Sequence, residues 1–100
     1  MIRGTTPQHR FLLPFAAESL AALRVSYAQR GEVLAERTLS ECAVNENAIT
    51  VTLTQEETLS FVAGERVQIQ VRALTKEGKA HASRILRVSV SDCLCEEVLA

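Results

Sequence analysis

The side chains that could act as nucleophiles, bases or metal ligands are few and widely separated in this sequence. They are two histidines, three cysteines and one aspartate: His9, His81, Cys42, Cys93, Cys95 and Asp92. An active site needs a nucleophile with a base, a pair of carboxylates or a metal ion. The motifs Gly-x-Ser-x-Gly, Gly-x-Gly-x-x-Gly and Gly-x-x-x-x-Gly-Lys-Ser/Thr are also absent. We therefore expect no catalytic residue and no enzyme activity.

Two of the cysteines are close enough in sequence to suggest a metal pair. Cys93 and Cys95 flank Leu94, so both thiols could face one side of a strand. A closed zinc site needs about four ligands, and Cys42 and the two histidines lack ligand spacing to this pair. We interpret the pair as small apolar side chains at a strand edge and expect no metal and no cofactor. The number of cysteines is odd, and the first residues do not resemble a signal peptide. We therefore predict that all three thiols are free.

The histidines and the adjacent carboxylates have structural explanations. His9 is predicted to lie on the face of its strand opposite the neighbours of Phe11, and His81 follows a turn, so we expect both to be exposed. Glu56 and Glu57 are adjacent, but a helix-capping role explains Glu57 and exposure to solvent explains Glu56. None of these side chains is predicted to bind a ligand.

Charge and aromatic content argue against nucleic-acid and membrane partners. Eleven basic and twelve acidic residues give a net charge of −1, and no apolar run approaches the roughly 20 residues of a membrane span. Arg72, Arg84 and Arg87 could form a basic stripe, but glutamate partners on neighbouring strands are the simpler interpretation. Single-stranded nucleic acid also needs exposed aromatic rings, and alternation assigns all four aromatics to the core. We expect no nucleic acid, no membrane and no small-molecule substrate.

Apolar residues alternate with a period of two along most of the chain, which predicts six or seven short strands. The segments are 11–15, 23–27, 33–35, 49–53, 67–73 and 86–90. Three polar tripeptides between them fit type I turns with a left-handed third residue and a bulge: Gln29-Arg30-Gly31, Asn45-Glu46-Asn47 and Lys76-Glu77-Gly78. Each should form an antiparallel hairpin.

Thr54 and Glu57 form the pattern of a capping box, which predicts one helical turn. This turn should carry the chain from one sheet to the other, and a further turn or loop covers residues 16–22. We predict a single domain over residues 1–100, an all-β antiparallel sandwich of six to eight strands, immunoglobulin-like or fibronectin III-like. Its predicted core contains Phe11, Leu13, Val25, Tyr27, Val51, Leu53, Leu59, Phe61, Ile69, Val71, Leu86 and Val88.

Four segments carry a resemblance to a known family: 2–7 (IRGTTP), 11–15 (FLLPF), 53–59 (LTQEETL) and 67–75 (VQIQVRALT). Together the chain resembles a family of short structural proteins of tailed phages and prophages of Firmicutes. The resemblance implies a virion structural or assembly component of a tail, neck or baseplate, present in the virion and in the host cytoplasm during assembly. Its partners would be other phage structural proteins, and no site residue is carried over. The alternative is a monomeric immunoglobulin-like module that binds a host protein or a saccharide.

An open sandwich leaves edge strands whose backbone can pair with another chain. Residues 1–7 and the residues after Cys95 are predicted to be frayed or to seek a partner. The segment from Thr5 to Leu13 and the run from Leu86 to Leu94 are the candidate edges, and the second run continues apolar beyond the predicted core. We therefore predict a homo-oligomer formed through one or both ends of the chain.

Overall fold

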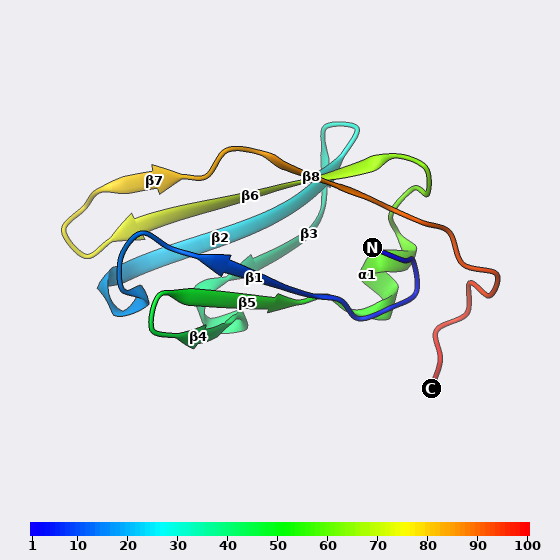
Figure 1. The fold of residues 1–100 in the computed structure, drawn as a ribbon, viewed down its shortest axis with the longest axis horizontal. Helices are drawn as coiled ribbons and strands as arrows, with labels where there is room; N and C mark the ends of the chain where they lie inside the picture. The colour runs from blue at the N-terminus through cyan, green and yellow to red at the C-terminus, as the bar shows by residue number, and fades with distance from the viewer.

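The computed structural model describes residues 1–100 as eight β-strands in two antiparallel sheets (Figure 1). The strands are β1 Gln8–Leu12, β2 Leu20–Gln29, β3 Glu32–Thr38, β4 Ala43–Asn45, β5 Ala48–Thr52, β6 Arg66–Thr75, β7 Ala80–Ala82 and β8 Leu86–Ser89. One sheet has the order β1-β5-β4, and the other has the order β3-β2-β6-β7, with β8 also paired to β6. The predicted all-β sandwich is confirmed, and its eight strands are at the upper end of the predicted six to eight. The short strands β4 and β7 were not among the predicted segments, and the first strand covers residues 8–12 instead of 11–15.

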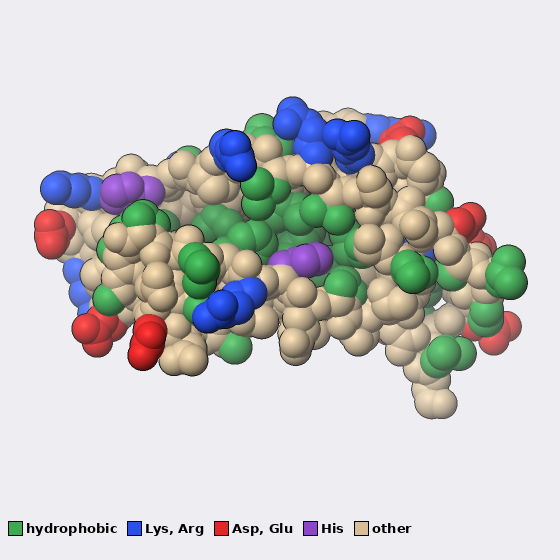
Figure 2. Space-filling model, in the orientation of Figure 1, with side chains coloured by type: hydrophobic (Ala, Val, Ile, Leu, Met, Phe, Trp, Pro, Cys, Tyr) green, Lys and Arg blue, Asp and Glu red, His purple; other side chains and the backbone are tan.

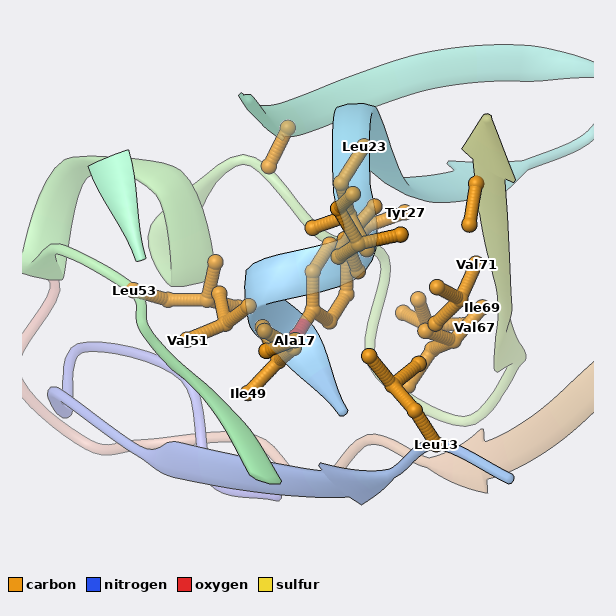
Figure 3. Close-up of a cluster of buried hydrophobic side chains, with 14 of the residues drawn as sticks. Leu13, Ala17, Leu23, Tyr27, Ile49, Val51, Leu53, Val67, Ile69 and Val71 are labelled. Carbon is orange, nitrogen blue, oxygen red and sulfur yellow. The ribbon is translucent and has the colours of Figure 1, made fainter. Parts of the chain in front are cut away.

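The core lies between the two sheets and consists of one cluster of buried apolar side chains (Figure 3). Its largest fully buried members are Tyr27, Phe61, Ile49 and Leu53. Eight predicted core residues are confirmed as buried: Leu13, Val25, Tyr27, Val51, Leu53, Phe61, Ile69 and Val71.

Four predicted core residues are only half-buried. Phe11, Leu86 and Val88 pack against the cluster but lie on β1 and β8, which each have a strand on one side only. Leu59 is the last residue of the helical turn between the sheets and packs beside Gly4. A β-carbon added to Gly4 would lie 3.4 Å from Leu59 Cδ2. The buried position of that helical turn is taken by Thr58.

All three predicted hairpins are present, but two of their turns differ from the prediction. Gly78, at φ +88°, donates its N–H to the carbonyl oxygen of Thr75 at 2.9 Å, as a type I turn with a left-handed third residue requires. The β2–β3 turn instead has two consecutive left-handed residues, Arg30 and Gly31, and the β4–β5 turn has one at Glu46. Strand pairing leaves only two residues in each of these loops, and two-residue hairpins favour turns of the mirror-image types.

The predicted capping box begins the helix α1, Gln55–Leu59. The Glu57 N–H donates to Thr54 Oγ1 at 3.2 Å, and the Thr54 N–H donates to Glu57 Oε1 at 2.9 Å. As predicted, α1 carries the chain from β5 in one sheet to β6 in the other. Two 3-10 turns, η1 Ala17–Ser19 and η2 Leu39–Glu41, complete the structure, and none of its helices is long and apolar enough to cross a membrane.

Residues 1–7 are bound to other parts of the same chain, so the prediction that they are frayed or seek a partner is wrong. The Gly4 N–H donates to Thr58 Oγ1 at 3.0 Å, and the Pro7 carbonyl oxygen accepts from the Leu53 N–H at 3.1 Å. Ile2 forms a parallel bridge with Ser91, and the Arg3 N–H donates to the Ser91 carbonyl oxygen at 3.0 Å. The Arg3 guanidinium also donates to Asp92 at 2.6 Å and to Glu96 at 2.8 Å. Residues 94–100, in contrast, are exposed throughout.

Candidate interaction surface

The side chains considered above for chemistry do not converge in the structure. All three cysteines are free: Cys42 and Cys93 are half-buried, and Cys95 is exposed. The Cys42 thiol donates to the Thr38 carbonyl oxygen at 3.2 Å. Nowhere do three or more His, Cys, Asp or Glu side chains gather as metal ligands would. The absence of catalysis and of a cofactor stays a prediction.

The side chain of His9 faces the core and is half-buried, so the prediction that it is exposed is wrong. His9 and Phe11 are two residues apart in β1, and side chains two apart in a strand face the same side. His9 Nδ1 lies 2.8 Å from the hydroxyl oxygen of Tyr27, which belongs to the opposite sheet and is fully buried. Burial lowers the pKa of His9 and raises the pKa of Tyr27. The pair therefore joins the two sheets with the imidazole in its neutral form.

This neutral histidine predicts an acid-sensitive fold. The unfolded chain protonates His9 near pH 6.5, whereas the folded chain, with the pKa of His9 lowered, resists protonation. Stability should therefore fall as the pH drops below about 6.5, because the unfolded state then binds more protons. Urea unfolding measured at pH 7.5 and 5.5 checks this. His9→Gln should reduce the difference between the two pH values, whereas the control His81→Gln, at an exposed position, should preserve it. A pH difference that survives His9→Gln would contradict the assignment.

Two strands share one edge of β6 and leave a break between them. β7 pairs with residues 72–74, and β8 pairs with residues 66–69. Ser83 lies in the break and satisfies the backbone groups of Val71 that no strand pairs. The Ser83 N–H donates to the Val71 carbonyl oxygen at 2.8 Å, and the Val71 N–H donates to Ser83 Oγ at 3.0 Å. Ser83 thus substitutes for the missing strand partner and aligns β7 with β8 along this edge.

Ser83→Ala should lower the free energy of unfolding by about 1–2 kcal/mol, since it leaves the N–H of the buried Val71 without an acceptor. Ser89→Ala is the matched control, because the Ser89 side chain is exposed and makes no hydrogen bond. Denaturant unfolding measures both, and amide hydrogen exchange at Val71 locates the effect. Equal stability of the two variants would exclude the proposed role of Ser83.

An apolar groove of about 500 Å³ separates β1 from the edge formed by β7 and β8. Figure 2 shows it as a hollow with hydrophobic side chains on its floor, between the upper and lower strands of that view. Buried Leu13, Val71 and Ala73 line the groove together with half-buried Phe11 and Leu86. The full lining is Arg10, Phe11, Leu12, Leu13, Pro14, Phe15, Val71, Ala73, His81, Ala82, Ser83 and Leu86.

The groove marks the side of the sandwich that no chain segment covers. At the opposite edges, β3 and β4 are joined directly through η2, and Leu39 and Cys42 of this connection pack against the core. At the groove, β1 and β8 each have one unpaired edge. The rings of Phe15 and His81 meet across one end of the groove, with centroids 5.2 Å apart. The groove therefore combines a floor of core side chains with unpaired backbone on both sides.

Comparison with protein-family models, with curated proteins and with solved structures gives no match to this chain.

The groove is bordered by arginines without acidic partners. Arg10 lines it, Arg84 lies between the lining residues Ser83 and Leu86, and Arg87 follows in β8. The five ion pairs of the molecule involve Arg3, Arg24, Arg30 and Arg37 only. The expectation of glutamate partners for Arg72, Arg84 and Arg87 is therefore wrong. Basic side chains are visible along both sides of the hollow in Figure 2, so the border of the groove carries positive charge.

Proposed function

We propose that this chain is a structural or assembly component of phage particles, in a tail, neck or baseplate, and that it acts through protein–protein packing. One observation carries the proposal: core side chains form the floor of an open groove between two unpaired strand edges. Natural sheets normally protect such edges, because they pair readily with other chains. The phage setting comes from the family resemblance, which also suggests other phage structural proteins as partners and the virion and the host cytoplasm as locations.

The position of the groove favours packing over the alternative of a monomeric binding module. Immunoglobulin-like binding modules use loops, whereas this groove follows strands. Saccharide binding also favours exposed aromatic rings, and Phe11 and Phe15 are half-buried with their rings against the core. A strand-lined apolar groove is better suited to an extended polypeptide.

Mass spectrometry of purified phage particles, produced by cells that carry this gene, tests the proposal. We expect peptides of this chain in the particles in a fixed ratio to another structural protein. Complementation of a gene deletion provides the matched comparison, because Leu12 in the groove and Val33 on β3 are both more than half exposed. Leu12→Glu should fail to restore particle formation, whereas Val33→Glu should restore it. Particles that lack the chain would overturn the proposal.

A further inference from the structure

We propose that the groove accepts an added β-strand and that residues 93–100 of a second copy of this chain supply it. This inference rests on the proposed packing function and names the partner of that surface. The added strand would hydrogen-bond to a free edge of β1 or β8 and would cover the apolar floor.

The dimensions of the groove suit one short strand. β1 has five residues, Gln8–Leu12, and pairs only with β5, so its other edge is unpaired over its whole length. At about 3.3 Å per residue, β1 is roughly 17 Å long, and an extended segment of eight residues spans roughly 26 Å. The segment 93–100 is therefore long enough to follow β1 completely.

The segment 93–100 carries several apolar side chains, is exposed from Leu94 onward, and is weakly held by its own chain. Leu94 is fully exposed, and Leu99 is 71% exposed. The specific contacts of residues 94–100 are two hydrogen bonds between Gln55 and Leu99, at 2.8 and 3.0 Å, and the ion pair of Glu96 with Arg3. Few contacts must therefore break before these residues add to another copy.

Charge favours this segment over a face-to-face contact of two grooves. The segment carries Glu96 and Glu97, whereas the groove is bordered by Arg10 and Arg84 without acidic partners. Two grooves in contact would place arginines against arginines, which costs free energy. Donation of residues 93–100 instead brings opposite charges together. It also makes a head-to-tail contact, which closes into a ring or continues as a filament.

Sedimentation of the full chain with substitutions tests the donor and the acceptor separately. We expect self-association of the unmodified chain that weakens with added salt. Leu94→Ser with Leu99→Ser should weaken it roughly hundredfold, because two apolar side chains would no longer be buried. Arg84→Glu should weaken it as well. The control Lys76→Glu, at the β6–β7 turn and outside the groove, should leave it unchanged.

A disulfide trap tests the contact directly, with native Cys95 as the reporter of the donor segment. In a chain whose Cys42 and Cys93 are replaced by serine, Ala82→Cys places a thiol in the groove. Mild oxidation should then produce an intermolecular disulfide between this introduced thiol and Cys95. The further change Cys95→Ser should reduce the yield of intermolecular disulfide. The remaining yield would come from the introduced thiols of two copies reacting with each other. Lys76→Cys is the control substitution, and its thiol should not react with Cys95.

These outcomes separate the inference from the proposed function. A monomeric chain at high micromolar concentration would overturn strand donation between copies. Association that is insensitive to both the Leu94/Leu99 and the Arg84 substitutions would overturn it equally. In either case, the detection of the chain in phage particles decides the proposed function independently.

Discussion

Phe61→Ala should lower the free energy of unfolding by about 3–5 kcal/mol, because it removes a large aromatic side chain that is only 2% exposed. A domain of this size has a total stability of about 5–15 kcal/mol, so the loss is a large part of it. Phe61 follows α1 closely, and its N–H donates to the Thr58 carbonyl oxygen at 3.3 Å. Its ring therefore packs into the core where the chain passes between the sheets.

Urea or guanidinium unfolding at pH 7.5 measures this loss. The neighbouring Val62 is 36% exposed, so Val62→Ala is the matched control and should cost about 1 kcal/mol or less. If the two variants unfold at the same denaturant concentration, Phe61 does not pack as described.

Arg37→Ala should lower the free energy of unfolding by about 2–3 kcal/mol. Arg37 on β3 pairs with Glu57 of α1, and their side chains are only 14% and 21% exposed. The Arg37 guanidinium also donates to the Thr52 carbonyl oxygen at 3.1 Å, so one side chain connects β3, β5 and α1. Its removal leaves the Glu57 carboxylate largely buried without its cation.

Arg24→Ala is the matched control, because the pair of Arg24 with Glu36 is 53% and 40% exposed. Exposed pairs contribute little, and we expect a loss of less than about 1 kcal/mol. The Arg37 pair should also weaken in acid. The hydrogen bond from Arg37 lowers the pKa of Glu57 from 4.5, so its stabilisation is complete above that pH and is lost as the pH falls through the lowered pKa. Equal losses for the two arginine variants would contradict this account.

Local patterns in the sequence predicted most of the fold. Alternation located the long strands β2 and β6, because each of these has one face against the core. The capping box located α1, because both of its hydrogen bonds lie within four residues. The turn types at Arg30 and Glu46 were not predictable in the same way. They follow from how the flanking strands pair, and three polar residues do not specify that pairing.

The interaction surface depends on contacts between distant segments, so sequence patterns did not reveal it. The groove exists because β1 is the edge strand of one sheet, whereas β7 and β8 pair with different parts of the same edge of β6 in the other. The inward position of His9 could have been predicted from the sequence. Its spacing of two from Phe11 and four from Leu13 places it on the inward face of the strand.

The pairing of Ile2 with Ser91 has a consequence for synthesis of the chain. Residues 1–3 leave the ribosome long before residues 89–96, which hold their backbone and ion-pair partners. During translation residues 1–3 therefore remain without these contacts until residues 89–96 have emerged. Because such distant contacts close slowly, the attachment of residues 1–3 should be among the last steps of folding. A nascent chain stalled before Ser91 would then display Met1, Ile2 and Arg3 to proteases and chaperones.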